Sequence, residues 1–528
     1  MAIYQVRQLA SVRTPDDNQI YVVRRDLSGG INSRQHGSVI GDNQSTVLYN
    51  VDLGTAGQSS KRPGSVLIGN DVGNNTVLGL HNFEIQGETD QLLMYEGTSV
   101  YKWTGAGNWT ALKADFTAST EVGMCSGKES GLAPDDVVII QNGVDNAFRL
   151  DSDGNFQDLG NTAGTASDSP PSSTVMAWYG NRFWVLKNDQ LYFSDAYSDD
   201  YSDCWDTVSN VFRIPVGEER GIVPTRDTGM IIMGREAIWG LAPSAVPVAT
   251  DKPEPIVTNR GVVSKNGFVN AGDDIYYFSQ DGFRALRRTV QDKLQAGVDY
   301  PLSYFLKDEF DRINFAYIER LSIEYFDNKI FIAVPTGATT FDTWVYYPEA
   351  KSFTVIQGWT PTCWERYKIS GEEYLYYGTI SNGKVYKAWS GYTDEGTTTT
   401  NGTAINYQEE GRKEDGGQPL VKKCGGVLKI KALSSGNYNL TVYASIDDQA
   451  YVTLGTINLT GTAPTLPVNL PFTLASANII TESFPLDSLG EWNQIRIKIV
   501  HNAANGSDVI TVLEREIISY ALAFEDGA

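Results

Sequence analysis

Histidine and cysteine are both scarce in this chain, which has 3 histidines and 4 cysteines among its 528 residues. The cysteines lie far apart and form no C-x-x-C pair, so they suit neither a zinc site nor a disulfide framework, and we expect small, buried, reduced residues. Their positions are Cys125, Cys204, Cys363 and Cys424. The sequence also contains no H-E-x-x-H, no G-x-S-x-G and no glycine-rich loop that ends in Lys-Ser or Lys-Thr. We therefore predict no catalytic residue, no metal site and no cofactor.

Long apolar runs are missing as well. No stretch approaches the ~20 apolar residues that a membrane helix needs, and residues 1–20 lack the apolar core of a signal peptide. We therefore expect a protein that is made in a reducing cytoplasm and inserts into no membrane. The net charge is -22, from 42 basic and 64 acidic residues. Because an acidic surface repels nucleic acid over roughly a Debye length, a role in coating DNA is not expected.

Short aromatic and β-branched runs between turn dipeptides are abundant. Gly180-Asn181 and Asn188-Asp189 cut the segment Val175–Asp195, VMAWYGNRFWVLKNDQLYFSD, into three such runs. These side chains suit a half-buried pleated surface, and strands joined by two-residue turns pair antiparallel. A further run at Val211–Ile214 completes four strands in about 40 residues, which is the size of one propeller blade. We expect the aromatic side chains to pack between blades.

The same pattern recurs from about residue 76 to residue 390. Its copies start near residues 92, 137, 175, 230, 274, 321 and 374. About seven copies at a spacing of roughly 40 to 50 residues predict a six- or seven-bladed β-propeller in an all-β fold. A β-helix or solenoid would repeat in about half that length. A short amphipathic helix is expected at 301–316, with Phe305, Phe310 and Ile313 on one face.

Composition changes on both sides of this repeat region. Residues 1–70 are dense in Gly, Asn and Ser, and we predict an irregular N-terminal arm that packs with the C-terminal part. Residues 71–395 are predicted to form the propeller. A polar, linker-like stretch follows, and residues 396–528 are predicted to form a β-sandwich platform.

The platform prediction depends on strands of period two. Apolar and polar residues alternate in Val427–Ala432, Tyr438–Ser445 and Gln494–Val500, and Leu513–Ala523 supplies a closing strand. Such alternation indicates a sheet with one buried face.

Two acidic segments could carry chemistry. Asp151–Asn155 alternates oxygen ligands as a calcium loop does, but it lacks a glutamate at the twelfth position, and its Asp-Gly pair favours a hairpin turn. The second segment is an acidic loop that contains Asp195, Asp199, Asp200, Asp203 and Asp206. Paired carboxylates can hydrolyse glycosides, but this polar loop offers no burial that would separate their pKa values. A solvated loop is therefore favoured.

Basic doublets interrupt the acidic background. They are Arg24-Arg25, Lys61-Arg62, Arg287-Arg288 and Lys422-Lys423. One interpretation is surface solvation or the protection of strand edges. The other is that a doublet meets the acidic surface of a partner and sets its orientation. The candidate assembly contacts are Arg24, Arg25, Lys61, Arg62, Lys422 and Lys423.

The N-terminal motifs resemble those of a known family. Gly29–Asn32 (GGIN), Leu48–Asp52 (LYNVD) and Lys61–Gly64 (KRPG) follow one another as at the start of many tailed-phage structural proteins, where such a series precedes a β-propeller. Two later segments look similar to the same proteins as well. They are FSD (Phe193–Asp195), which leads into the acidic loop, and RGVVSK (Arg260–Lys265), which leads into IYYFS (Ile275–Ser279). Together these segments resemble the tail hub, or nozzle, proteins of short-tailed bacteriophages.

This resemblance implies a structural virion protein of the tail, made in the bacterial host cytoplasm and without enzymatic activity. Such proteins form a hexameric ring below the portal and adaptor, with tail fibres or spikes around the outside. Double-stranded DNA leaves through a central channel without specific binding. The net acidity agrees with such a channel, because each contact of a basic side chain with a phosphate adds affinity. In a cyclic ring, each subunit needs two different complementary patches.

Two other functions stay open. One is a receptor-binding or glycan-cleaving phage tail protein that is built on a propeller. The other is a cellular propeller that acts as an interaction scaffold. A ring of about six copies would support the nozzle, whereas a monomer that binds or cleaves host glycans would contradict it.

Overall fold

In the computed structural model, the segment Val175–Asp195 forms the meander that its turns predict. Its strands pair antiparallel in chain order with one that follows: β14 (Met176–Tyr179), β15 (Arg182–Lys187), β16 (Gln190–Phe193) and β17 (Val211–Arg213). Gly180-Asn181 and Asn188-Asp189 have positive φ at both positions. Two-residue hairpin turns of the primed type require this conformation, so the local prediction of one blade is confirmed.

The aromatic side chains of this blade alternate between its two faces. Phe183 is fully buried and packs in a cluster with Ile139 of the preceding blade. Trp184, the next residue, points the other way into a cluster with Ile222 of the following blade. Because neighbouring residues of a strand face opposite sides, one strand supplies both contacts. The aromatic residues therefore pack between blades, as expected.

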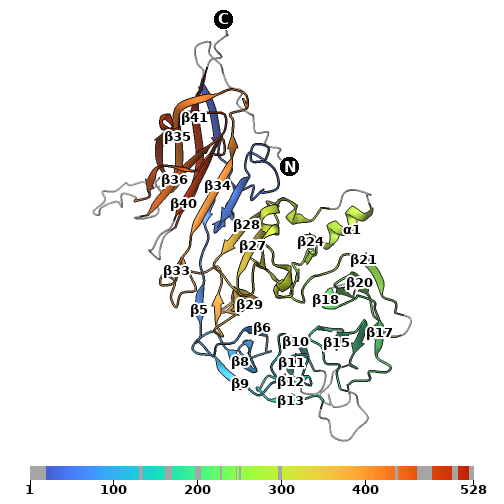
Figure 1. Ribbon diagram of the computed structural model, residues 1–528. Helices are drawn as coiled ribbons and strands as arrows, with labels where there is room; N and C mark the ends of the chain where they lie inside the picture. Colours follow the sequence, from blue (N-terminus) through green and yellow to red (C-terminus); the bar gives the residue numbers. More distant parts are fainter. Residues whose placement is uncertain are drawn as a thin grey trace, which may run out of the picture.

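The structure describes residues 19–129, 135–160, 169–196, 204–225, 229–244, 247–248, 251–294, 300–433, 438–460, 479–501 and 509–522. Within this part the protein is all-β apart from short helices. Figure 1 shows blades arranged in a ring, with an elongated platform of N-terminal and C-terminal strands at its edge.

Six blades are separate sheets in the described part of the chain. The first contains β6 (Val77–Phe83), β7 (Gln91–Glu96), β8 (Ser99–Trp103) and β9 (Thr110–Lys113). The second contains β10 (Gly123–Lys128), β11 (Asp136–Gln141), β12 (Phe148–Asp151) and β13 (Phe156–Asp158). After β14–β17 come β18 (Glu219–Thr225), β19 (Gly229–Gly234), β20 (Ala237–Leu241) and β21 (Glu254–Thr258). A three-stranded blade follows, with β22 (Phe268–Asn270), β23 (Ile275–Ser279) and β24 (Gly282–Ala285).

The next position in the ring is filled by strands that belong to a larger sheet. They are β25 (Ser322–Phe326), β26 (Lys329–Pro335), β27 (Phe341–Tyr347) and β28 (Ser352–Gln357). Strand β25 contacts β22 on one side and β29 on the other, as the innermost strand of a blade does. The ring thus consists of six separate blades and one shared with the platform, and the expected propeller is confirmed.

An N-terminal strand closes the ring. The last blade contains β29 (Pro361–Ile369), β30 (Glu372–Thr379), β31 (Val385–Lys387) and β5 (Val66–Ile68). β5 pairs with β31, and β29 contacts β6 of the first blade. A strand from the start of the chain thereby covers an edge that would otherwise be open. The propeller begins inside the predicted arm, before the expected boundary at residue 71.

The platform consists of two sheets. The nine-stranded sheet continues from β28 through β2 (Ser45–Tyr49), β34 (Tyr407–Glu414), β40 (Ile495–His501), β36 (Asn439–Ile446) and β37 (Val452–Asn458). The seven-stranded sheet runs through β3 (Val51–Asp52), β4 (Ser59–Lys61), β41 (Thr511–Ala521), β35 (Lys423–Leu433) and β38 (Ile479–Pro485), with β1 (Gln19–Arg24) on β41 and β39 (Glu491–Trp492) on β35. A further pair is β32 (Thr393–Asp394) with β33 (Thr403–Ala404).

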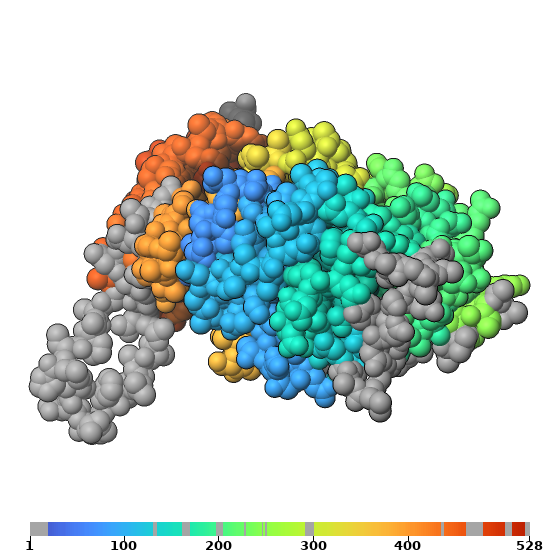
Figure 2. Space-filling view, turned by 90° about the horizontal axis from the view of Figure 1, so that it is seen from below, coloured from blue at the N-terminus to red at the C-terminus, as the bar shows by residue number. Residues whose placement is uncertain are grey.

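One hydrophobic core joins the platform to the propeller. It includes Ile430 of β35 and Ile499 of β40, from the two facing sheets, and also Trp344 of β27 in the shared blade, all fully buried. On the face in Figure 2 the platform strands (orange) lie directly against N-terminal strands (blue). A continuous sheet and a continuous core make the two lobes one body.

The helix expected at 301–316 is broken. The helical elements are α1 (Leu286–Leu294), η2 (Leu302–Phe305), α2 (Lys307–Asp311), η3 (Phe315–Arg320) and η4 (Asp487–Leu489). Leu306 leaves the helical conformation, with φ of -90° and ψ of 59°, and turns the chain between η2 and α2. As a result Phe305 is 40% exposed while Ile313 is buried, so the prediction of one shared face is wrong.

Candidate functional site

Three of the six predicted assembly contacts are buried within the chain. They are Lys61, Arg62 and Lys423. The Lys423 ammonium donates to the backbone carbonyls of Gln418, Val421 and Asn493 at 2.8 to 2.9 Å. Burial lowers its pKa from the ordinary lysine value. The prediction that these three residues contact a partner is wrong, because their side chains are engaged inside the fold.

Arg62 is the centre of the junction between the propeller and the platform. Its guanidinium forms a two-pronged ion pair with Asp394, with nitrogen–oxygen distances of 2.8 and 2.6 Å. It also donates to the side-chain oxygen of Asn50 at 2.9 Å and stacks over the Trp359 ring, 4.7 Å from the ring centroid. Trp359 in turn donates to Asp394 at 2.7 Å. The arginine side chain is fully buried, and the side chain of its partner Asp394 is only 6% exposed.

The other N-terminal motifs meet at the same junction. Asn50 of the LYNVD motif has φ of 58°, and its side chain accepts from the Gln357 N–H and donates to the Asn406 carbonyl. Gly30 of the GGIN motif has φ of 75°, and a Cβ there would lie 2.6 Å from the Cβ of Ser352. The three motifs thus fix the arm against the shared blade and the linker. Their common role in this structure is to hold the two lobes together.

Gly64 of the KRPG motif provides a direct test of this junction. A Cβ at Gly64 would lie 1.9 Å from the carbonyl oxygen of Thr393, which is a backbone atom and cannot swing away. We expect Gly64→Ala to lower the free energy of unfolding by about 1 to 3 kcal/mol, measured by chemical denaturation. Gly41→Ala is the matched control, because its nearest atoms are side-chain ends at 3.3 Å or more. Equal stability of the two variants would contradict the packing described here.

The remaining predicted contacts lie at the platform surface. Arg25 is 76% exposed and pairs with Glu514, and Lys422 is 61% exposed and pairs with Glu491. Arg24 is less exposed and pairs through two nitrogens with Glu414, at 2.8 and 2.7 Å. Arg25 and Lys422 are therefore the two predicted contacts that a partner could reach most easily.

A cavity of about 820 Å³ occupies the centre of the propeller. Residues of the innermost strand of every blade line it, including Val77, Gly123, Met176, Ile222 and Phe268. None of the site residues predicted from the sequence lines this cavity. The charged residues of the cavity lie just before or within the first strand of a repeat. A charged residue at that position in the repeat is therefore the sequence signal that could have predicted the cavity lining.

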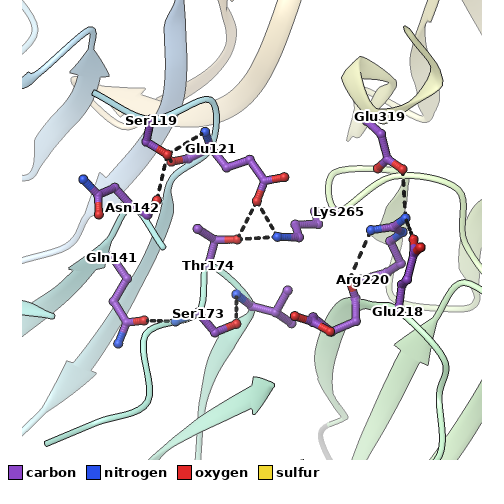
Figure 3. A network of polar contacts seen from close by, with 12 residues as sticks. Ser119, Glu121, Gln141, Asn142, Ser173, Thr174, Glu218, Arg220, Lys265 and Glu319 are labelled. Atoms are coloured by element: carbon purple, nitrogen blue, oxygen red, sulfur yellow. Dashed lines mark hydrogen bonds and ion pairs between the residues drawn. The ribbon is translucent and has the colours of Figure 1, made fainter. Parts of the chain in front are cut away.

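An ion-pair network lies among the residues that line the cavity (Figure 3). The Lys265 ammonium, on the loop before β22, pairs with Glu121, which precedes β10, and donates to the Thr174 hydroxyl at 2.9 Å. These partners belong to blades two and three positions away in the ring, so the lysine side chain reaches across the opening.

A second group of charges lies beside the first (Figure 3). Arg220 pairs with Glu218 at 2.6 Å and with Glu319 at 2.9 Å. Arg235 pairs with the same two carboxylates, at 2.9 and 3.8 Å. Burial raises the pKa of Glu319, and the nearby carboxylates raise it further, while the two arginines oppose this. The network contains equal numbers of cationic and anionic side chains.

Two further carboxylates line the cavity, Glu324 on β25 and Glu365 on β29. Glu324 pairs with Arg366 at 3.1 Å, and its side chain is 18% exposed. Burial raises the pKa of Glu365 to about 8, and the charge of Glu324 contributes in the same direction. His81, which also lines the cavity, hydrogen-bonds Ser126 at 2.6 Å, and burial lowers its pKa to about 4. Glu324 is thus paired with Arg366, whereas Glu365 forms no ion pair with any described residue.

The acidic segments singled out in the sequence lie elsewhere. Asp151 and Gly154 form the hairpin turn between β12 and β13, so the preferred interpretation of that segment is confirmed. Asp195 follows β16 and Asp206 precedes β17, and Asp199, Asp200 and Asp203 lie outside the described residues. Across the described segments, no group of three or more His, Cys, Asp or Glu side chains is placed to hold a metal ion. Nor does that part of the chain contain a helix long and apolar enough to cross a membrane.

Comparisons with known proteins identify no family. No protein-family model and no curated protein matches the chain. Among solved structures, an exo-β-1,3-galactanase from Phanerochaete chrysosporium with β-1,3-galactotriose is 10% identical, with a TM-score of 0.28, over 87% of this chain and 100% of its own. BBS1N in complex with ARL6DN is 11% identical, with a TM-score of 0.34, over 62% of this chain and 96% of its own. The strand pairing within the chain, rather than these similarities, defines the propeller.

Proposed function

We propose that this protein is a structural component of a short-tailed phage virion, which builds a ring-shaped tail nozzle between the portal–adaptor vertex and the distal tail. The observation that carries the proposal is the sheet that runs without a break from the β25–β28 blade into the platform. A subunit that must transmit force and keep a channel open requires lobes that do not move against each other. The fused sheet, the common core and the buried Arg62–Asp394 pair provide this rigidity.

The N-terminal motifs support the same proposal. They are the segments that resemble the nozzle family, and they converge on the junction instead of lying scattered on the surface. The net charge of -22 supports a surface along which double-stranded DNA slides without being bound. Fibres or spikes and the adaptor are the partners that such a subunit would contact.

Assembly into a ring tests the proposal. We expect purified protein at micromolar concentration to give rings of about six copies by native mass spectrometry and negative-stain imaging. Because β2 lies between β28 and β34, deleting the arm would open the shared sheet, so surface substitutions are the cleaner probe. The double variant Arg25→Glu/Lys422→Glu should weaken assembly, because it places repulsive charges on the platform surface.

The control carries the same charge change on the propeller, as Lys252→Glu/Lys368→Glu at two exposed lysines. A wild-type monomer that binds or cleaves host glycans would contradict the proposed function and favour the alternative tail-protein role. If rings form equally well in both double variants, the proposed function is not contradicted, but Arg25 and Lys422 are excluded as contacts between subunits.

A further inference from the structure

A second cavity, of about 470 Å³, lies on the nine-stranded sheet and shares no lining residue with the central cavity. Four neighbouring strands of this sheet, β2, β34, β40 and β36, contribute residues to it, and the last three lie side by side in Figure 1. Its residue on β2 is Tyr49, which belongs to the LYNVD motif. That motif thus contributes to this cavity as well as to the junction between the lobes.

The strand register places the lining side chains on the outer face of the platform. Gln408 of β34 lies opposite Tyr49. Glu410, two positions further along β34, lies opposite Lys498 of β40, which in turn lies opposite Tyr443 of β36. Residues two positions apart on a strand share a face. The alternate residues of these strands are fully buried in the sandwich, and they include Leu48, Glu409, Ile499 and Val442. The cavity therefore lies on the face that is turned away from the sandwich core.

The charge in this cavity is already paired. Among the described residues that line it, Lys498 is the only charged one. Its ammonium pairs with Glu410 at 3.3 Å and lies 5.2 Å from the centroid of the Tyr451 ring. The Tyr451 hydroxyl donates to the other oxygen of Glu410 at 3.0 Å. Burial raises the pKa of Tyr49 and of Tyr451, so both hydroxyls stay protonated at neutral pH. A ligand of this cavity is therefore expected to be uncharged.

Several polar groups of the lining are available to bond a ligand. The hydroxyl of Tyr443 and the side-chain amides of Gln357 and Asn406 form no hydrogen bond with another described residue. The amide nitrogen of Gln408 donates to Glu410 at 3.1 Å, which leaves its amide oxygen available. A hydroxyl both donates and accepts, and an amide side chain has two donor hydrogens and one acceptor oxygen. The cavity thus offers donors and acceptors together, next to tyrosine side chains.

We propose that this cavity binds a neutral oligosaccharide, whose ring faces pack against the tyrosine side chains and whose hydroxyls bond the unpaired amide and hydroxyl groups. Each sugar hydroxyl both donates and accepts, which matches a lining that presents both kinds of group. The C–H bonds on the face of a sugar ring are slightly positive and are attracted to the negative face of an aromatic ring. A volume of about 470 Å³ lies within the range of ligand sites in proteins, roughly 300 to 1,000 Å³.

Two other classes of ligand fit this lining less well. A nucleic acid or an acidic sugar needs an unpaired cation, but Lys498 is already paired with Glu410. A proline-rich peptide also docks on aromatic grooves, but its backbone offers mainly carbonyl acceptors. The amide oxygens of Gln357, Asn406 and Gln408 would then stay without donors from the ligand.

Binding of the sugar does not depend on assembly, since the whole lining comes from one chain. A ring would multiply the sites and strengthen attachment to a surface that displays many sugar chains. Rings that bind no sugar would therefore contradict this site and leave the proposed nozzle uncontradicted. Monomers that bind a sugar would support this site and contradict the nozzle.

The test uses the full chain with neutral trisaccharides and tetrasaccharides of glucose, galactose and mannose, and with oligogalacturonate as the acidic counterpart. Binding is followed by ligand-observed saturation-transfer NMR. We expect saturable binding of at least one neutral sugar and weaker or no binding of oligogalacturonate. Tyr443→Ala should weaken the binding roughly tenfold or more, because it removes both a ring and a hydroxyl from the lining. Tyr443→Phe, which loses only the hydroxyl, should weaken it about fivefold.

The matched control is Tyr520→Ala. Tyr520 is 44% exposed and lies on β41 of the seven-stranded sheet, so its loss should leave sugar binding unchanged. Equal binding in the wild type and Tyr443→Ala would overturn the proposal, as would tighter binding of oligogalacturonate than of any neutral sugar. No binding of any neutral sugar would overturn it too, and saturable binding of decaproline in its place would favour a peptide site. If Tyr443→Ala fails to fold, Tyr443→Phe takes its place, and unchanged binding in that variant would count against the proposal.

Discussion

Replacing Arg62 by alanine is expected to lower the free energy of unfolding by about 3 to 5 kcal/mol. The substitution leaves the Asp394 carboxylate buried without its cation, and leaves the side-chain oxygen of Asn50 without one of its donors. Removing one partner of a buried ion pair is costly because the other charge stays desolvated and uncompensated. The loss of the stacking contact with Trp359 adds to the effect.

The measurement is the shift of the denaturant midpoint, followed by tryptophan fluorescence. Arg25→Ala is the matched control, because Arg25 also pairs with a carboxylate but is 76% exposed. Its loss should change the midpoint little, since exposed ion pairs contribute about 1 kcal/mol at most. Similar shifts for the two variants would show that the buried network does not hold the junction.

The second large effect is expected between the two sheets of the platform. Arg515 of β41 pairs with Glu409 of β34, and both side chains are buried. Glu409 also accepts from the hydroxyls of Tyr407 at 2.8 Å and Ser59 at 3.1 Å. Burial lowers the pKa of Arg515 to about 10 and raises that of Tyr407 to about 12. A polar network therefore bridges the sandwich where apolar packing would be usual.

Arg515→Met should cost about 3 to 5 kcal/mol, because Glu409 is then left as an unpaired buried carboxylate. The double variant Arg515→Met/Glu409→Leu should recover most of that loss, because both desolvated charges are removed together. The Tyr407 and Ser59 hydroxyls can still bond each other, since they lie 2.8 Å apart. A double variant as unstable as the single one would mean that the polar network itself, rather than the unpaired charge, determines the stability of the sandwich.

Local chemistry was sufficient to predict the strands. Turn dipeptides such as Asn188-Asp189 adopt positive φ because of their own side chains, and they set the length of the strands that flank them. Alternation in β35, β36 and β40 follows from which face of each strand is buried. These signals lie within a few residues of one another, so the sequence could reveal blades, repeat length and sandwich strands.

The partner of each charged side chain could not be predicted in this way. Arg62, Lys423, Arg25 and Lys422 all belong to basic doublets that look alike in the sequence. Arg62 and Lys423 are nevertheless buried, whereas Arg25 and Lys422 are exposed. The difference depends on Asp394, 332 positions away from Arg62, and on carbonyls that converge on Lys423.

The sequence by itself therefore determined an all-β chain of short, turn-linked strands with a propeller-sized repeat and a period-two C-terminal region. The tertiary structure alone decided that β5 closes the ring, that β2 joins the shared blade to the platform, and that the charges of several blades meet at one cavity. The physical reason is that turn and strand preferences are local, whereas pairing and burial depend on segments that approach each other only when the ring closes.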